Sequence, residues 1–463
     1  MPAMTSAHPL MAQIDWATAC SEATQIFRAL LRIDTTNSPD RPGNETEACE
    51  YLRGLLEAEG IPCQLLESAP GRGNLVSRLP GDGSGGDPIL LSAHVDVVPA
   101  EPEHWDHPPF GAEIHDGFIW GRGAIDMKNM AAMEVATMLA LKRSGLPLTR
   151  DLIFAAVADE EAGCEFGSLW LAENHPELIR GEYAISEIGG FTLHAGGQRF
   201  YPVQVAEKGV CWITVTASGT PGHGSLPNKD NPIPKIAAAA QKLGLRRLPH
   251  HRSDVVDRFI NQLADNHSFP SSMILRSLLR PSVAGKILDT VFPDKDLASS
   301  FDAMLHNTAN PTILKAGLKV NQVPGEASLQ VDGRLVPGQT GANLIAEIEA
   351  LIGPGYSYRI DRELPAVEGD PDDPMAVRIA DVLARFDPGG IPIPTMIPGF
   401  TDAKAYDRLG MKCWGFSPVR LPPGVKFAQM FHGHNERIPV DGFEAGVVAL
   451  FDLVSGLVLE PAC

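Results

Sequence analysis

Basic charge and long apolar runs are scarce in this sequence. Its 463 residues include 38 Lys or Arg against 57 Asp or Glu, which gives a formal net charge of −19. Because a polyanion of this size is repelled by nucleic-acid phosphates and anionic lipid surfaces, we expect neither nucleic acid nor membrane as a partner. The sequence has no apolar run of about 18 or more residues that would span a membrane, and its first residues do not resemble a signal peptide.

Cysteine is also sparse, and its pattern is not that of a disulfide scaffold or a zinc finger. The seven cysteines are odd in number, scattered, and form no C-x-x-C pair; they stand at positions 20, 49, 63, 164, 211, 413 and 463. This usage is typical of a reducing compartment, and we expect a cytoplasmic protein. Motifs of nucleophilic and nucleotide-binding enzymes are absent too: there is no G-x-S-x-G, no phosphate-binding G-x-x-x-x-G-K-[ST] loop and no dinucleotide fingerprint.

The length and composition that remain are those of a multidomain globular protein. With 44% hydrophobic and 21% charged residues, the chain can bury more than one core. The first half alternates helical patterns, at 15–33 and 45–60, with apolar strand patterns at 62–68, 73–81, 89–96, 152–158 and 183–190. This alternation predicts an α/β fold whose catalytic domain has three layers around a mixed, mostly parallel sheet.

The pattern changes near residue 207. Strands with one polar face and a largely helical stretch at 248–307 predict a smaller α/β domain with an antiparallel sheet that is wet on one side. We therefore expect a first domain at 1–206, an inserted lid or dimerisation domain at 207–365, and the rest of the first domain at 366–463. Within that last part, residues 394–410 are predicted to be a loop that leads to a helix.

The most informative stretch is residues 89–96, ILLSAHVD, which has the pattern of a buried central strand. His94 and Asp96 stand at its end and point the same way, because strand side chains alternate with period two. Ligands of open α/β sheets bind at this edge. The pair is either a metal ligand with its orienting carboxylate or a strand-end histidine capped by a loop residue.

Further carboxylates follow the later apolar strands. Asp126 precedes a helical pattern at 131–145 and could by itself be a simple N-cap. The strand pattern at 152–158 is followed by three carboxylates, Asp159, Glu160 and Glu161. They either face a cation or form an ordinary charged loop in solvent. The strand pattern at 183–190 carries Glu187 near its end.

Together with a histidine from HGHNE at 432–436, these residues form one candidate site. Imidazole and carboxylate ligands without thiolate suit Zn²⁺, Mn²⁺ or Co²⁺. About five ligands and a spare carboxylate exceed the needs of one ion and favour two, about 3.5–4 Å apart, bridged by a carboxylate and a water. Such a centre predicts amide or ester hydrolysis by the bridging water.

The motifs SAHVDVVP, GRGAIDMK, ADEEAG, SEIGG, GTPGHGSLP and FHGHNERIP occur in this order over nearly the whole chain. In order and spacing they resemble the zinc-dependent aminoacylase/carboxypeptidase metallopeptidase family, of the aminoacylase-1, vacuolar Gly-X carboxypeptidase, acetylornithine deacetylase and succinyl-diaminopimelate desuccinylase type. The resemblance implies two Zn²⁺ per chain, with Co²⁺ or Mn²⁺ as substitutes, and an inserted lid that often dimerises. The long lid, GFSP and HGxNERIP are most similar to the vacuolar carboxypeptidase and N-acyl-amino-acid hydrolase branch.

The resemblance also implies roles for individual residues. Asp126 would bridge the two ions, and the remaining ligands would be His94 and Glu187 for one ion and Glu161 and His432 for the other. His432 is preferred to His434 because the ligand of the family lies four residues before the glutamate, here Glu436.

Other residues would carry the catalytic steps. Glu160 would be the general base and Asp96 would orient His94. His223, in GTPGHGS, would reach a catalytic site, often across a dimer, to stabilise the oxyanion; the alternative is an ordinary loop histidine.

Substrate contacts are implied for Asn321, Arg334 and Lys404. Lys404 stands where the family often has arginine, and a lysine cannot grip a carboxylate as a bidentate fork.

We therefore expect a dinuclear-zinc amidohydrolase that cleaves N-acyl amino acids or small peptides and dimerises through the lid. The alternatives are a dipeptidase or carboxypeptidase acting strictly on peptides, esterase or carbamoylase activity at the same site, or a non-catalytic metal-binding protein on the same fold. The intact Glu160 argues against the last of these, because a pure binder needs no general base.

Overall fold

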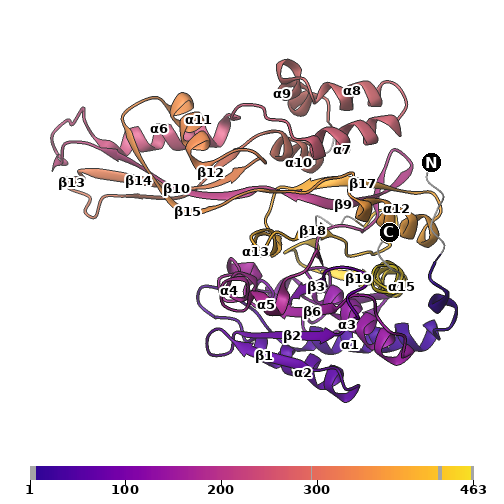
Figure 1. Cartoon of the computed structure of the whole chain (residues 1–463). Coiled ribbons are helices and arrows are strands. Elements are labelled where there is room, and N and C mark those ends of the chain that lie inside the picture. The colour runs from indigo at the N-terminus through magenta and orange to yellow at the C-terminus, as the bar shows by residue number, and fades with distance from the viewer. Residues whose placement is uncertain (1–6, 293–294, 426–429, 460–463) are drawn as a thin grey trace. The chain divides into compact units, whose positions relative to one another are not determined.

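The computed structural model describes residues 7–292, 295–425 and 430–459 (Figure 1). Cys463 and the first six residues, which entered the expectations about disulfides and targeting, lie outside the described residues. The chain divides into two compact units. The first comprises Met1–Val205, Gly369–Ile393 and Thr401–Cys463, and the second comprises Ala206–Glu368 and Pro394–Phe400.

A large mixed sheet organises the first unit. Its strands, in spatial order, are β1 (Cys63–Glu67), β2 (Gly73–Leu79), β6 (Leu152–Val157), β3 (Ile89–His94), β7 (Tyr183–Ser186), β18 (Lys412–Gly415) and β9 (Gln198–Glu207), with β8 (Leu193–Ala195) and β17 (Gly390–Ile397) paired to β9. The last two residues of β9 pair with β16 (Val367–Glu368) and, like β16, are assigned to the second unit. The four central strands β6, β3, β7 and β18 run parallel. Every residue of β3 and β6 is buried, as expected of central strands that read as continuous apolar runs.

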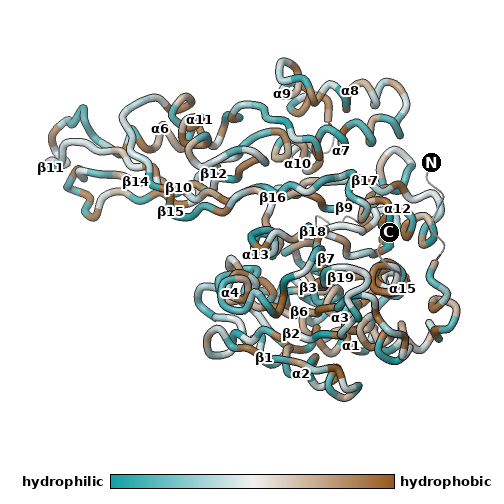
Figure 2. The backbone as a smooth tube through the Cα atoms, in the orientation of Figure 1, coloured by the Kyte–Doolittle hydropathy of each residue, from teal (hydrophilic) through white to brown (hydrophobic). Residues whose placement is uncertain are grey.

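Helices pack around this sheet. They are α1 (Trp16–Arg32), α2 (Glu45–Ala58), α3 (Lys128–Ser144), α4 (Ser168–Asn174), α5 (Pro176–Ile179), α12 (Pro374–Phe386), α13 (Ala403–Asp407) and α15 (Val440–Val458), with short 3₁₀ turns at Pro9–Ala12, Pro102–His104 and Glu160–Ala162. Helix α3 packs on β3 and β6 and also on α1 and α15. Figure 2 shows α15 as a mostly hydrophobic helix, in keeping with its many buried residues. The predicted mixed α/β class is confirmed.

A small sheet carries the loops that surround the candidate site. It contains β4 (Ile114–His115), β5 (Phe118–Trp120) and β19 (Arg437–Pro439). Asp116 and Gly117 connect β4 to β5 with positive φ angles of 49° and 78°, the conformation that a two-residue hairpin turn requires. The Asp-Gly pair is the sequence that favours such a turn.

The second unit is built on an antiparallel sheet in the order β12 (Thr308–Ala316), β14 (Glu326–Leu335), β10 (Gly209–Ser218) and β15 (Tyr356–Leu364). Burial alternates along β14, and the buried side chains form a core with α6 (Pro232–Leu245) and α11 (Gly341–Ile352). Four helices occupy the stretch predicted to be helical: α7 (Asp254–Asp265), α8 (Ser271–Ser277), α9 (Pro281–Thr290) and α10 (Lys295–Leu305). A short pair, β11 (Gly222–His223) with β13 (Gln322–Val323), completes the unit.

One sequence prediction fails here. Residues 394–397 were expected to be loop, but they are the end of strand β17, which pairs with β9. Prolines at 392 and 394 hid this strand, because proline lacks the N–H that a ladder needs and is confined to edge or irregular positions.

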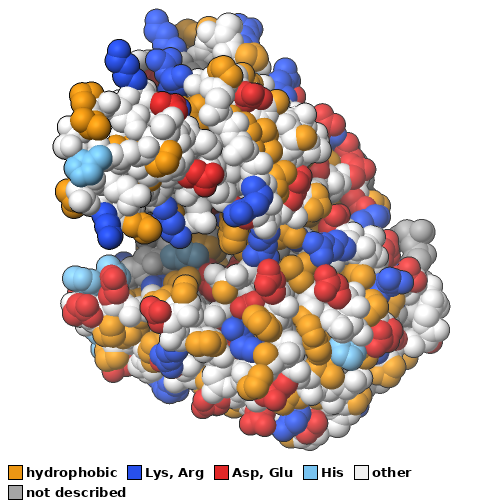
Figure 3. Space-filling model, turned by 90° about the vertical axis from the view of Figure 1, so that its left-hand side faces the viewer, with side chains coloured by type: hydrophobic (Ala, Val, Ile, Leu, Met, Phe, Trp, Pro, Cys, Tyr) orange, Lys and Arg blue, Asp and Glu red, His pale blue; other side chains and the backbone are white. Residues whose placement is uncertain are grey.

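Among the described residues, no helix has both the length and the hydropathy needed to cross a membrane. Figure 3 shows acidic and basic side chains on the same face, with hydrophobic ones among them.

Candidate metal centre

Parallel strands bring the predicted ligands to one edge of the first unit's sheet. β3 lies between β6 and β7, and its last residue, His94, is in register with Val157 at the end of β6. Glu160 and Glu161 follow β6 after two residues, and Glu187 directly follows β7. Because all three strands point the same way, their carboxyl ends deliver one imidazole and three carboxylates to the same place.

Asp126 lies at the centre of this group. Its Oδ1 is 2.9 Å from Nε2 of His94, and its Oδ2 is 3.0 Å from Nε2 of His432. The N-cap alternative for Asp126 is wrong, because Lys128 begins α3 and Met127 occupies the cap position without a side-chain cap. Each oxygen of one carboxylate thus faces a different histidine.

Two sets of ligands meet at Asp126. On one side, Nε2 of His94 lies 3.6 Å from Oε2 of Glu187 and 4.0 Å from Oε2 of Glu160. On the other side, Nε2 of His432 lies 3.0 Å from Oε2 of Glu161. Among these contacts, the distance from Glu160 to His94 is the longest.

The centre is largely buried, and its charges shift one another. Burial raises the pKa of Glu161 to about 7, and repulsion by Asp126 adds to this. Burial raises the pKa of Glu187 to about 8, and it raises the pKa of Glu160 well above its usual range, with repulsion by Glu187 adding to this. Burial alone would also raise the pKa of Asp126, but hydrogen bonds from His432 and His94 hold it below its usual range.

The residues fit divalent metal ions. Oε1 of Glu161 and Oε1 of Glu187 are buried and have no hydrogen-bond partner among the described residues, an unfavourable arrangement unless a cation or water meets them. Within the described residues, His94 takes part in two groups whose ligand atoms lie within 4.8 Å of one another, one with Glu160 and Glu187 and one with Asp126 and Glu161. Two imidazoles and several carboxylates suit Zn²⁺, Co²⁺ or Mn²⁺.

Asp96 holds both the histidine and the turn that carries the carboxylates. Its Oδ1 lies 3.4 Å from Nδ1 of His94, as a carboxylate that orients a ligand histidine would. The two carboxylate oxygens also accept from the backbone N–H groups of Glu160, at 3.1 Å, and Glu161, at 3.2 Å. Asp96 is fully buried, so these bonds are shielded from water.

Glu436 organises the loop before Asp126, a role that the sequence did not indicate. Its carboxylate accepts from the backbone N–H groups of Gly123, Ile125 and Asp126 and pairs with Arg122 at 2.8 Å. Glu436 therefore ties the Asp126 loop to the segment that carries His432. The only signal in the sequence was its fixed spacing from His432, which does not reveal what it contacts.

Asp159 belongs to a supporting network rather than to the ligand group. It pairs with Arg72 at 2.7 Å, and Asn37 bonds to both Asp159 and Asp96. Arg72 in turn pairs with buried Glu45 at 2.9 Å. Asn37 and Arg72 lie in stretches that carry no motif, so no sequence signal marked them.

His434 lies outside the ligand group, since its Nε2 contacts Glu101 at 2.8 Å. Lys404 is on α13 and is 3% exposed. Its neighbour Asp402 is fully buried and accepts from Ser168 Oγ at 2.5 Å, and burial raises the pKa of Asp402 to about 6.

The other three predicted residues belong to the second unit. The backbone N–H of Gly224, next to His223, donates to the carbonyl of Asn321 at 2.8 Å, so these two predicted residues lie close together. Arg334 is the second-last residue of β14, away from Asn321, which precedes that strand. Its guanidinium pairs with Asp332 at 2.9 Å and lies over the ring of Phe400.

Comparison with known proteins gives these residues a family context. The profile of "Peptidase family M20/M25/M40" matches residues 90–456. The chain is 27% identical over 450 residues to the N-fatty-acyl-amino acid synthase/hydrolase PM20D1 of Bos taurus, covering 93% of this chain and 86% of that protein. It is also 27% identical over 446 residues to aminoacylase-1 of Sus scrofa, covering 94% and 95%.

Solved structures have the same fold. Human carnosine dipeptidase 1 superposes with a TM-score of 0.68 at 13% identity, covering 98% of this chain and 99% of that chain. The YXEP protein of Bacillus subtilis, described as a dinuclear metal binding peptidase of the M20 family, superposes with a TM-score of 0.58 at 13% identity, covering 94% and 98%. This chain therefore belongs to the metal-dependent peptidase family M20/M25/M40 and is a hydrolase that acts on amide bonds.

Proposed function

We propose that the protein hydrolyses the amide bond of N-acyl amino acids or of small peptides at a centre that holds two Zn²⁺ ions. The observation that carries the proposal is the position of Asp126, whose two oxygens face His94 and His432 from two separate ligand sets. The relatives named PM20D1 and aminoacylase-1 support the N-acyl amino acid as substrate class. When bound, divalent ions at such a site polarise a carbonyl and acidify water.

Glu160 would move the protons of the reaction. Its raised pKa suits a group that takes a proton from water and passes it to the leaving amine nitrogen. Asp96 would keep Glu160 in place, since it accepts from the backbone N–H of that residue. Both Glu160 and Asp96 lie in the first unit.

His223 would donate a hydrogen bond to the oxyanion. Its Nδ1 accepts from the backbone N–H of Ser225 at 3.2 Å and lies 2.7 Å from Ser225 Oγ. With Nδ1 used as an acceptor, the neutral ring carries its proton on Nε2. An exposed Nε2–H on a strand pair is thus available to a substrate oxygen.

We also propose that residues 207–365 form a lid through which two copies assemble. Strand β14, from Glu326 to Leu335, is roughly 30 Å long at about 3.3 Å per residue. Asn321 and His223 lie beyond its first residue and Arg334 lies near its last. Because a small substrate cannot contact both ends, two copies must contribute if all three residues serve one reaction.

Arg334 is suited to hold the substrate carboxylate. Its Nη1 is buried and has no hydrogen-bond partner in the part of the chain that the structure describes, so a guanidinium donor remains available there. Lys404 would add a point charge and Asn321 an amide contact. A cytoplasmic location completes the proposal and is supported by six described cysteines that are all free thiols.

The test is hydrolysis of a mixed panel of N-acyl amino acids and dipeptides by metal-loaded protein, read as released amino acids by mass spectrometry. Release from acylated substrates supports the proposal. Release from dipeptides alone would restrict the proposal to its second candidate, a peptide-specific exopeptidase, which the name of the structural neighbour carnosine dipeptidase 1 supports. No release from any substrate, with Glu160→Gln indistinguishable from wild type, would refute both.

A further inference from the structure

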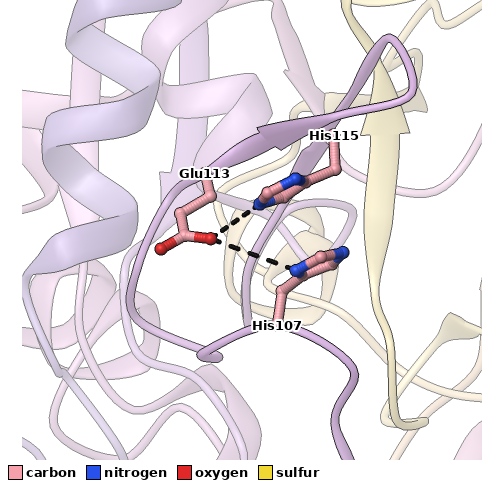
Figure 4. Close-up of side chains that lie close together, drawn as sticks. All are labelled: His107, Glu113 and His115. Atoms are coloured by element: carbon pink, nitrogen blue, oxygen red, sulfur yellow. Dashed lines mark hydrogen bonds and ion pairs between the residues drawn. The ribbon is translucent and has the colours of Figure 1, made fainter.

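A second group of metal-ligating side chains lies on the β4–β5 hairpin and the loop that precedes it, apart from the residues of the centre described above. It consists of His107, Glu113 and His115 (Figure 4), called here the hairpin triad. Their ligand atoms lie within 4.8 Å of one another, the same spacing that brings together the ligand groups around His94. His107 lies in the stretch WxHPPFxxxxxDGxxWGRGAIDMK, which resembles the family pattern, whereas Glu113 and His115 fall on its variable positions. The catalytic proposal uses none of the three side chains.

The backbone of the hairpin explains why the triad forms. Glu113 directly precedes β4 and is two residues from His115, and their side chains lie on the same side of the backbone, with Glu113 Oε2 2.7 Å from His115 Nε2. The backbone N–H of Trp120 donates to the carbonyl of Glu113 at 2.9 Å, and its indole Nε1 donates to the carbonyl of His115 at 3.3 Å. Trp120 thus holds both ends of the ligand-bearing strand.

His107 reaches the same point from the preceding loop. Its ring stacks on His115 with a centroid distance of 3.7 Å and an interplanar angle of 4°, and it packs edge-on against Trp120 at 4.6 Å. One oxygen, Oε2 of Glu113, lies 2.7 Å from Nε2 of His115 and 4.0 Å from Nδ1 of His107. Two imidazole nitrogens and one carboxylate oxygen therefore converge.

We propose that the hairpin triad binds one late first-row divalent ion, such as Zn²⁺, Co²⁺, Ni²⁺ or Cu²⁺. Two imidazoles and a carboxylate favour these ions over Mg²⁺ and Ca²⁺, which prefer oxygen ligands. The three side chains are between 26% and 46% exposed, so the ion has an entry path and water completes its coordination. Binding turns the stacked rings apart, because a metal lies in the plane of each imidazole that ligates it.

Occupancy of the triad acts on the loop that leads to the catalytic centre. Trp120 pairs with Arg437 of β19, and the next residue, Gly121, donates its N–H to the carbonyl of Glu436 at 3.1 Å. Glu436 is the residue that fixes the Asp126 loop. An ion that cross-links the hairpin to the preceding loop therefore stabilises the small sheet on which that loop rests.

The test compares zinc binding by untagged wild type, His115→Gln and His104→Gln. Each protein is dialysed against a series of buffered free Zn²⁺ concentrations, and bound zinc is measured by mass spectrometry. His104 is the matched control, an exposed histidine of the same loop that packs against His434 rather than the triad. We expect one ion fewer per chain in His115→Gln than in wild type and no loss in His104→Gln.

A second comparison guards against a folding defect. His107→Gln is expected to lose the same ion. Binding of the triad ion is expected to raise the melting temperature of wild type above the value reached by either triad variant with zinc at the Asp126 centre alone. Superimposable binding curves for wild type and both triad variants would overturn the proposal. Because the readout is a difference between variants, it stands even if no substrate is hydrolysed, and the amidohydrolase proposal is tested separately.

Discussion

Replacing Asp96 with asparagine removes charge from the buried carboxylate that supports the metal centre while keeping its size. One oxygen accepts from Glu160 N–H and faces Nδ1 of His94, and the other accepts from Glu161 N–H and from Asn37 Nδ2 at 2.9 Å. An asparagine keeps one acceptor oxygen and turns its NH₂ group toward the other two donors. One orientation loses the bond from Glu160 N–H and the 3.4 Å contact with His94, and the other loses the bonds from Glu161 N–H and Asn37 Nδ2.

The loss has a definite size. At about 1.5–3 kcal/mol for each hydrogen bond to a charged group, Asp96→Asn should lower the free energy of unfolding by about 1.5–3 kcal/mol in the orientation that loses only the bond from Glu160 N–H. Because the ring of His94 loses its orienting carboxylate, metal affinity should fall by about 10–100-fold. Urea denaturation measures the first effect, and competition with a chromophoric chelator measures the second.

Asp373→Asn is the matched control. Asp373 is also buried and accepts from Tyr183 Oη, Lys412 Nζ and the N–H of Met375, but it does not contact the metal centre. It should lose comparable stability and keep wild-type metal affinity. If Asp96→Asn also kept wild-type affinity, Asp96 would be a structural carboxylate only, and the reasoning about His94 would be refuted.

Three further predictions concern catalysis, pH and substrate binding. Glu160→Gln should lower kcat by about 10²–10⁴-fold while the metal content stays unchanged. Steady-state hydrolysis measures the first quantity and metal analysis the second. A loss of bound metal that accompanies the loss of activity would show that Glu160 is a metal ligand instead. In the folded metal-free protein the pKa values of Glu161 and Glu187 are about 7 and 8, above the ordinary glutamate value, so its melting temperature should fall as the pH rises from that ordinary value to about 8. With metal bound the trend should reverse, because the ions need deprotonated ligands. A flat melting-temperature profile of the metal-free protein would contradict these raised pKa values. Lys404→Met should raise KM about tenfold or more for substrates with a free carboxylate, and Lys404→Arg should not; an equal change for amidated substrates would exclude a carboxylate contact.

The sequence predicted the ligand group because the physics of a parallel sheet is simple. A buried apolar strand that ends in His94 or Glu187 can place those side chains only at the carboxyl edge, where neighbouring strands end together. The mutual contacts of His94, Asp126 and His432 agree with that expectation, although the role of each residue stays a prediction.

The supporting residues could not be predicted in the same way. Asn37 and Arg72 lie in loops or strands without a motif, and they meet Asp96 and Asp159 only after the chain folds. Asp159 looked equivalent to Glu160 and Glu161 in the sequence, but its pairing with Arg72 gives it a structural position. Such long-range contacts leave no local periodicity that sequence reasoning could use.

The most direct test of the central claim is the rate of amino-acid release from N-acyl substrates as chelator-stripped protein is reloaded with Zn²⁺. We predict that activity is absent without metal, rises with the ions bound at the Asp126 centre and is lost in Asp126→Asn at every metal concentration. Equal hydrolysis by stripped and reloaded protein, or full activity in Asp126→Asn, would contradict a reaction centred on Asp126.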